Sequence, residues 1–189
     1  MKFREVEAKY SAENITLTAF QAFCNGREPK VLKVVEAAGF DYFYAHPSNP
    51  DAFYRHRVGP DFNQLTFKRK TIQGNSNIRI ERNTNLSPTT TKEEVAALVG
   101  EHGYTFNTAI FKTCFVYFFD WYVLSYYVCY DKDLKELGRY MEIEANEEHD
   151  WATEQDAWNA VVVMEKLCKP LGLTPQMRIK RSLFELYRT

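Results

Sequence analysis

The sequence predicts an α+β fold in which helices pack against an antiparallel β-sheet. Extended segments occur in groups before and after a helical segment, rather than alternating with helices one by one. Aromatic residues make up 15% of the chain, which favours strands. Charged and apolar residues alternate along several of the extended segments. This alternation is typical of strands whose two faces meet different surroundings.

The composition predicts a single domain over residues 1–189, because no linker or low-complexity run divides the chain. The net charge of −1 gives no overall attraction for nucleic acid or for an anionic membrane. No apolar stretch approaches the roughly 18 residues needed to cross a bilayer. The beginning of the chain lacks the apolar core of a signal peptide. The four cysteines are scattered, as in a protein with reduced thiols, so we expect a cytoplasmic protein without membrane or nucleic-acid partners.

The first half of the chain is predicted to contain a short helix and a series of strands. The helix is expected over residues 15–25, before Asn25 and Gly26. A strand is expected in FREVEAKY, and further strands over 31–36, 40–46, 53–59, 63–71 and 76–84. Turns are expected at Gly59-Pro60 and at Gly74-Asn75.

The second half is predicted to contain a helix, three strands and further helices. TTTKEEVAALVGEHG is expected to be helical, because Thr91 and Glu94 have the spacing of a capping box. Strands are expected over 109–119, 121–130 and 139–146. A helix is expected to begin at Thr153 and to end before Pro170, and the tail RIKRSLFELY is expected to be helical. The aromatic run FVYFFDWYVLSYYV is interpreted as core.

Five of the predicted strands carry doubled charged residues on one face. The polar faces contain Glu5, Glu7 and Lys9; Arg55 and Arg57; Thr66, Lys68 and Lys70; Arg79 and Glu81; and Glu142 and Glu144. A single strand of this kind is typical of a half-exposed sheet. Its recurrence in five strands suggests that the charged faces meet in the lumen of a closed sheet. His56 lies between Arg55 and Arg57, so alternation points it away from that lumen.

A lumen of this composition is suited to a polyphosphate bound with a divalent metal. Enclosed charges are tolerated only when they compensate each other or a bound ion. Carboxylates are hard oxygen ligands that suit Mg²⁺ or Mn²⁺. Arginine and lysine bind phosphate oxygens. The pattern therefore predicts a site for a small phosphate compound and Mg²⁺ or Mn²⁺.

Six segments resemble, in order, the motifs of the CYTH or triphosphate tunnel metalloenzyme superfamily. Residues 5–9, EVEAK, resemble the ExExK signature that opens CYTH domains. The later matches are FDYFYAHPSNPDAFYRHR, LTFKRK, NIRIER, YDKDLKELGRYMEIEA and LGL…RSLFELY, which extend to residue 187. The length and spacing resemble most closely the branch of class IV adenylyl cyclases and thiamine triphosphatases.

The resemblance implies a closed antiparallel eight-stranded β-barrel, the triphosphate tunnel, with helices packed on the outside. By position, the metal ligands would be Glu5, Glu7, Glu142 and Glu144. The phosphate-binding residues would be Lys9, Arg55, Arg57, Lys68, Arg79 and Lys112, and the catalytic residues Lys9, Glu81 and Asp131. Cys114 stands where the family has an arginine, so either Lys70, Arg139, Lys180 or Arg181 replaces that arginine or phosphate binds less tightly.

The function implied by the resemblance is that of a class IV adenylate cyclase, which converts ATP to cyclic AMP and pyrophosphate. The first alternative is a triphosphatase that hydrolyses thiamine triphosphate, inorganic triphosphate or a nucleoside triphosphate. The second is a polyphosphate or nucleotide-binding protein without activity, which Cys114 favours. The resemblance also allows for a homodimer, and the residues themselves do not demonstrate one.

Overall fold

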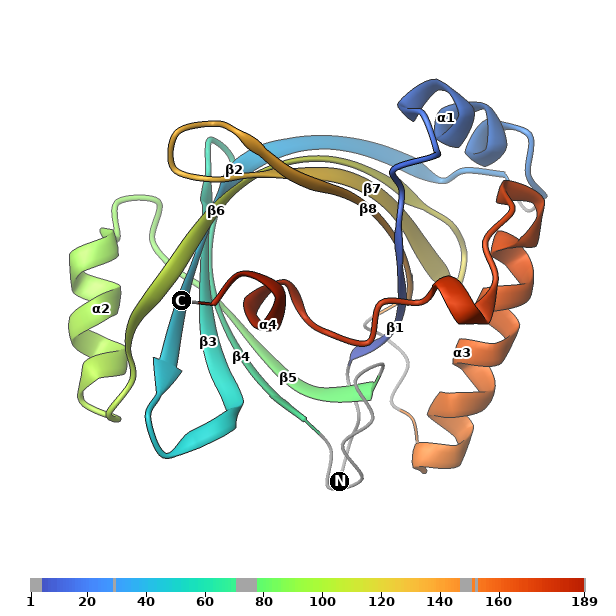
Figure 1. The fold of residues 1–189 in the computed structure, drawn as a ribbon. Coiled ribbons are helices and arrows are strands. Elements are labelled where there is room, and N and C mark those ends of the chain that lie inside the picture. The colour runs from blue at the N-terminus through green and yellow to red at the C-terminus, as the bar shows by residue number, and fades with distance from the viewer. Residues whose placement is uncertain (1–4, 29, 71–77, 147–150, 152, 189) are drawn as a thin grey trace.

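The eight strands form one closed antiparallel barrel (Figure 1). The computed structural model describes residues 5–28, 30–70, 78–146, 151 and 153–188. The strands are β1 (Glu5–Ser11), β2 (Lys33–His46), β3 (Asn49–Gly59), β4 (Phe62–Lys70), β5 (Ile78–Asn85), β6 (Thr105–Phe118), β7 (Tyr122–Tyr130) and β8 (Glu136–Ala145). Around the barrel they follow the order β1-β5-β4-β3-β2-β6-β7-β8. The predicted closed antiparallel barrel is confirmed.

Strand β2 differs from the prediction, because residues 31–36 and 40–46 belong to one strand rather than two. The small residues 37–39 continue the strand because β6 pairs with it from Lys33, opposite Phe118, to Ala45, opposite Thr105. This long partner also explains why β6 begins at Thr105 rather than at residue 109. The predicted turn at Gly74-Asn75 and the first two residues of FREVEAKY lie outside the described residues.

Helices α1 (Leu17–Asn25), α2 (Lys92–Gly100) and α3 (Glu154–Cys168) cover the outer face of the barrel (Figure 1). A further helix, α4 (Leu183–Tyr187), and short 3₁₀ helices at Lys169–Leu171 and Pro175–Met177 follow α3 along the chain. The predicted capping box of α2 is present, since Glu94 N donates to Thr91 Oγ1 at 3.2 Å and Thr91 N donates to Glu94 Oε2 at 2.7 Å. Within the described residues, no helix has the length and apolar character to cross a membrane.

The tail is helical only at its end. Residues 178 and 179 instead run beside β1, where Arg178 pairs with Tyr10 and Ile179 N donates to the Lys9 carbonyl at 2.8 Å. This long-range pairing overrides the helical pattern of the segment. The chain then turns into α4, which lies across one end of the barrel (Figure 1) and packs Leu183 and Phe184 against inward-facing side chains of the strands.

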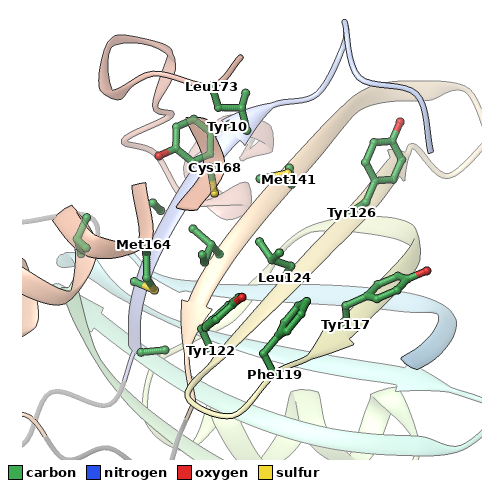
Figure 2. Packing of buried hydrophobic residues seen from close by; sticks show 14 of the residues in the cluster. Tyr10, Tyr117, Phe119, Tyr122, Leu124, Tyr126, Met141, Met164, Cys168 and Leu173 are labelled. Carbon is green, nitrogen blue, oxygen red and sulfur yellow. The ribbon is translucent and has the colours of Figure 1, made fainter. Parts of the chain in front are cut away.

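The largest hydrophobic cluster lies outside the barrel wall, between the strands and helices α1 and α3. Tyr10, Leu124 and Met141 from the outer face of the sheet pack near Met164 and Cys168 of α3 (Figure 2). All five are at most 1% exposed. Because the outward side chains of these strands are apolar, their charged neighbours in the sequence point into the barrel. His56 is buried on the outer face, with Nε2 at 2.7 Å from Asn63 Oδ1, which confirms its predicted direction.

At Gly39 the long strand β2 packs closely against the turn between β3 and β4. A Cβ atom at this position would lie 2.2 Å from the Val58 carbonyl oxygen and 2.9 Å from the Phe62 ring. Because backbone must move to relieve that contact, we expect Gly39→Ala to lower the free energy of unfolding by about 1–3 kcal/mol. The free energy of unfolding is measured by urea denaturation, with tryptophan fluorescence as the signal.

The matched control is Gly100→Ala, at the end of α2, where an added Cβ would meet no atom within 4 Å. We expect this variant to be as stable as the wild type or slightly more stable. Equal stability of the Gly39→Ala and wild-type proteins would show that the barrel wall is not close-packed at this point.

Candidate functional site

A cavity of about 760 Å³ occupies the barrel and is lined by charged side chains from most of its strands. The charged lining residues are Glu5, Glu7, Lys9, Asp41, Arg55, Arg57, Lys68, Arg79, Glu81, Lys112, Asp120, Glu142 and Glu144. At one end the lining is completed by Leu183 and Phe184 of α4. At the other end it is completed by Leu32, Phe118 and Val123. We call this cavity the tunnel.

The strand register places four glutamates on one wall. In the pairing of β1 with β8, Glu7 lies opposite Glu144 and Lys9 lies opposite Glu142. Residues directly opposite in an antiparallel pair project from the same face, with their Cβ atoms about 4.5–5.5 Å apart. Glu5 lies two residues before Glu7 on the same face. The four predicted metal ligands are therefore neighbours in space, although they come from the two ends of the chain.

The first ion-pair network joins β1 with β4 and β5. Lys68 Nζ pairs with Glu5 and lies 2.7 Å from Glu81 Oε2. Arg79 NH1 lies 3.5 Å from Glu5 Oε2 and 3.3 Å from Glu7 Oε1. Burial opposes the ionisation of Glu5, but Lys68 and Arg79 outweigh it and hold the pKa of that carboxyl well below its ordinary value. Glu5 is therefore a carboxylate at neutral pH.

The second network joins β1 with β8 and β7. Lys9 Nζ lies 3.1 Å from Glu142 Oε1 and 3.5 Å from Glu7 Oε1. The Tyr127 hydroxyl donates to Glu142 Oε1 at 2.7 Å. Burial disfavours the charge on Glu142, but the nearby cations, Lys9 above all, lower its pKa to about 2. Tyr127 was not predicted as a site residue because it lies in an aromatic run interpreted as core. Its inward position on β7, two residues after Ser125, is the signal that could have found it.

Glu144 has the most unfavourable surroundings for a negative charge. Burial, followed by the carboxylates of Glu5, Glu81 and Glu7, raises the pKa of Glu144 well above its ordinary value. A divalent cation at this point would relieve the repulsion, and carboxylate oxygens are ligands that Mg²⁺ and Mn²⁺ accept. The donor set therefore fits such a metal in chemistry. Within the described parts of the chain, however, no three His, Cys, Asp or Glu side chains are arranged for metal coordination as they stand.

The opposite wall contains a pair that the sequence analysis did not single out. Arg57 binds Asp41 with two hydrogen bonds, Nε to Oδ1 at 2.7 Å and NH2 to Oδ2 at 2.9 Å. Asp41 is 1% exposed, and its pKa is held below the ordinary value because Arg57, with help from Lys112 and Arg55, outweighs the effect of burial. The sequence analysis did not predict that Asp41 points into the barrel, because polar and apolar residues alternate only weakly in FDYFY. Cys114 also lines the tunnel, beside this pair.

Four predicted residues lie outside the tunnel. Asp131 Oδ1 accepts the backbone N–H groups of Asp133 and Lys135, both at 2.9 Å, and so organises the turn after β7. Arg139 precedes the inward Tyr140, so alternation turns it outward, where its Nε lies 2.7 Å from Glu136 Oε1. The other two are Lys70 and Arg181, of which Lys70 pairs with Glu185 of α4 at 2.5 Å and Arg181 is exposed.

Of the candidates to replace the missing arginine at Cys114, none lines the tunnel. Lys180, like Arg181, is exposed. On β3, β4 and β6 the basic side chains that line the tunnel are therefore Arg55, Arg57, Lys68 and Lys112, with Lys112 Nζ 4.3 Å from the centre of the Tyr127 ring. The other predicted site residues, Lys9, Arg79, Glu81 and the four glutamates of β1 and β8, all line the tunnel.

Comparisons with known proteins show where this fold occurs. No family model and no curated protein matches the sequence. The PH1819 protein from Pyrococcus horikoshii OT3 has 21% identity and a TM-score of 0.72, over 96% of this chain and 97% of that chain. A "putative adenylate cyclase" from Vibrio parahaemolyticus has 16% identity and a TM-score of 0.69, over 96% of both chains. A "putative adenylate cyclase" from Bacillus halodurans has 14% identity and a TM-score of 0.56, over 98% of both chains.

At these identities the likeness shows a shared fold. The closed antiparallel barrel that the resemblance to the CYTH superfamily implied therefore agrees with the observed fold. The Vibrio and Bacillus proteins each align over nearly their whole length with nearly the whole of this chain.

The Asp41–Arg57 pair should make stability depend on pH in the acidic range. The folded pKa of Asp41 lies below the unfolded value of about 3.9, so the pair stabilises fully above about pH 4 and progressively less as the pH falls. We expect Asp41→Asn to cost about 3 kcal/mol of unfolding free energy at pH 7, because it leaves Arg57 without its partner. The difference in unfolding free energy between Asp41→Asn and wild type should become smaller below pH 4, because Asp41 of the wild type is then increasingly protonated.

Urea denaturation between pH 7 and pH 3 measures this effect. The control is Asp133→Asn, because Asp133 is exposed and its replacement should leave stability unchanged. A difference between Asp41→Asn and wild type that stays constant over the range would contradict the assigned ionisation of Asp41.

Proposed function

We propose that this protein is a metal-dependent enzyme of the CYTH type that acts on a triphosphate bound in the tunnel. The observation that carries the proposal is the combination of a carboxylate cluster with many cationic side chains in one enclosed cavity. Glutamates of β1 and β8 line the same cavity as arginine and lysine side chains of β3, β4, β5 and β6. Carboxylates suit a divalent cation, and guanidinium and ammonium groups suit phosphate oxygens.

The charge balance of the tunnel supports the requirement for a metal. Seven carboxylates and six cationic side chains line it, so its formal charge is −1 when all are ionised. A triphosphate brings several further negative charges into a space where unbalanced charge is costly. Mg²⁺ or Mn²⁺ entering with the triphosphate would supply the missing positive charge. This is the usual role of the metal in phosphoryl transfer.

The side chains already paired in the tunnel would exchange partners when the ligand binds. Glu5, Glu7, Glu142 and Glu144 would hold the metal, which would neutralise charge on the phosphate oxygens. Lys68, Arg79 and Lys9 now pair with carboxylates of this set. With those carboxylates held by a metal, the three cations would be able to donate to the phosphates and to orient them along the tunnel.

The proposed reaction is that of a class IV adenylate cyclase. The ribose 3′-hydroxyl of ATP attacks the α-phosphate, and cyclic AMP and pyrophosphate are formed. The likeness in fold to the Vibrio and Bacillus proteins, each named a "putative adenylate cyclase", supports this reaction. Hydrolysis at the γ-phosphate by water would use nearly the same side chains and is the alternative. Asp131 receives no role in either, because it lies in a turn outside the tunnel.

A binding protein without activity is the remaining candidate. Two observations favour it: Cys114 cannot donate to phosphate as an arginine does, and Arg57 is engaged by Asp41. The buried glutamates argue for the enzyme, since phosphate binding alone needs no carboxylate cluster.

Replacing the glutamates of β1 tests the proposed function. We expect Glu5→Gln and Glu7→Gln to lower metal-dependent turnover at least about 100-fold, because they remove metal ligands from the buried wall. Purified protein is incubated with ATP, thiamine triphosphate or inorganic triphosphate, each with Mg²⁺ or Mn²⁺, and the products are separated by chromatography. Circular dichroism checks that the barrel remains folded. The control is Glu136→Gln, because Glu136 lies outside the tunnel, paired with Arg139.

The products separate the candidates. Cyclic AMP with pyrophosphate establishes the cyclase, and orthophosphate establishes the triphosphatase. If a triphosphate binds equally tightly with and without metal and is never consumed, the enzyme proposal is wrong and the alternative of a binding protein without activity is supported.

A further inference from the structure

Tyr127 is buried inside the barrel, where a carboxylate of the tunnel comes close to one of its cationic side chains. It lies on β7 and is 0% exposed. Its hydroxyl donates to Glu142 Oε1 at 2.7 Å, and the centre of its ring lies 4.3 Å from Lys112 Nζ. One side chain therefore contacts a prospective metal ligand on β8 and a prospective phosphate ligand on β6.

The register of the sheet explains how Tyr127 reaches both of these residues. Glu142 of β8 lies opposite Ser125, two residues before Tyr127. Lys112 of β6 lies opposite Cys129, two residues after Tyr127. Tyr127 is thus the diagonal neighbour of each, at a separation of about 7–8 Å that aromatic and long side chains can bridge. The backbone pairing therefore fixes the position of Tyr127 between the two.

The Tyr127 hydroxyl is the partner that Glu142 can keep when a ligand binds. In the structure Glu142 Oε1 also lies 3.1 Å from Lys9 Nζ. Under the proposed function Lys9 would donate to the phosphates instead, whereas a tyrosine hydroxyl is uncharged at neutral pH and is not drawn away by them. A hydrogen bond of this kind orients a metal-binding carboxylate, and its loss typically lowers metal affinity by about 10–100-fold.

The ring of Tyr127 gives Lys112 a position that a carboxylate gives to other lysines of the tunnel. Lys9 and Lys68 form ion pairs there, but among the residues that the structure describes Lys112 has no carboxylate within ion-pair distance. An ammonium close to an aromatic ring is attracted by the quadrupole of the ring, and its N–H donors stay available. Since Lys112 lines the tunnel, these donors can be offered to phosphate oxygens.

We propose that Tyr127 is a positioning residue, which holds Glu142 for the metal through its hydroxyl and Lys112 for the phosphates through its ring. This inference rests on the proposed function and deepens it, because it assigns one side chain to both halves of the same site. The hydroxyl and the ring have separate tasks, so substitutions can remove them one at a time.

Tyr127→Phe removes the hydroxyl and keeps the ring. We expect the affinity for Mn²⁺ to fall about 10-fold, both in electron paramagnetic resonance titrations of the protein with Mn²⁺ alone and in the Mn²⁺ concentration that half-saturates turnover. KM for the triphosphate at saturating Mn²⁺ should stay within about twofold, because the ring still holds Lys112. In a Glu142→Gln background, Tyr127→Phe should lower Mn²⁺ affinity no further, since the carboxylate that it orients is absent.

Tyr127→Met removes the ring and keeps much of the volume. We expect this variant to lose Mn²⁺ affinity as Tyr127→Phe does and, in addition, to raise KM for the triphosphate about fivefold. In a Lys112→Gln background it should raise KM no further. Circular dichroism checks folding, and Tyr127→Phe decides the proposal by itself if Tyr127→Met does not fold.

The matched control is Tyr126→Phe, on the same strand. Tyr126 lies in the cluster outside the barrel wall (Figure 2), is 3% exposed, and donates from its hydroxyl to the Ile15 carbonyl at 3.1 Å. This variant also loses a buried hydrogen bond, so it should lower the free energy of unfolding in urea. It should change neither Mn²⁺ affinity nor KM, because Tyr126 does not contact the tunnel.

The outcomes are distinct. Loss of Mn²⁺ affinity in Tyr127→Phe, with Tyr126→Phe unchanged, supports the proposal. Unchanged Mn²⁺ affinity in Tyr127→Phe, an equal loss in both tyrosine variants, or a further loss in the Glu142→Gln background overturns it while the proposed function stands. A wild-type protein that neither binds Mn²⁺ nor consumes any triphosphate overturns the proposed function as well.

Discussion

The structure depends on the compensation of charges that a closed barrel encloses. Carboxylates and cationic side chains face the same interior, where each unpaired charge would cost several kcal/mol. Lys68 between Glu5 and Glu81, and Lys9 between Glu7 and Glu142, meet that demand by sharing each ammonium between two carboxylates. Because charged side chains fill the interior of the barrel, the apolar faces of the strands point outward and must be covered by other elements. Helices α1 and α3 are therefore needed to complete the hydrophobic core.

Buried ion pairs of this kind contribute little to stability when compared with apolar residues of the same size. Their retention is better explained by what they can bind. In the structure the prospective metal ligands pair with the prospective phosphate ligands, as Glu5 does with Lys68 and Glu142 with Lys9. Under the proposed function, metal and triphosphate must favour each other's binding, because each releases the side chains that the other requires. This coupling is reciprocal by thermodynamic necessity.

The sequence was sufficient to predict the barrel and much of its charged lining, because strand alternation is a local property. Glu5, Glu7 and Lys9 could be placed on one face from spacing alone. Asp41 and Tyr127 were missed because aromatic neighbours on both sides conceal the alternation. Arg139 was proposed only to replace an expected arginine, although its odd spacing from Glu142 and Glu144 already placed it on the opposite face of β8. The backbone of residues 178 and 179 is extended through a contact with β1, which no local pattern in the tail reveals.

The position of α4 has a consequence for the kinetics of a reaction inside the barrel. Leu183 and Phe184 pack into one end of the tunnel and narrow it there. Under the proposed function, the product fragment bound nearer to α4 would therefore leave after the fragment bound farther from it. A phosphate or pyrophosphate held among Lys9, Lys68 and Arg79 would be retained longest and would inhibit the next turnover.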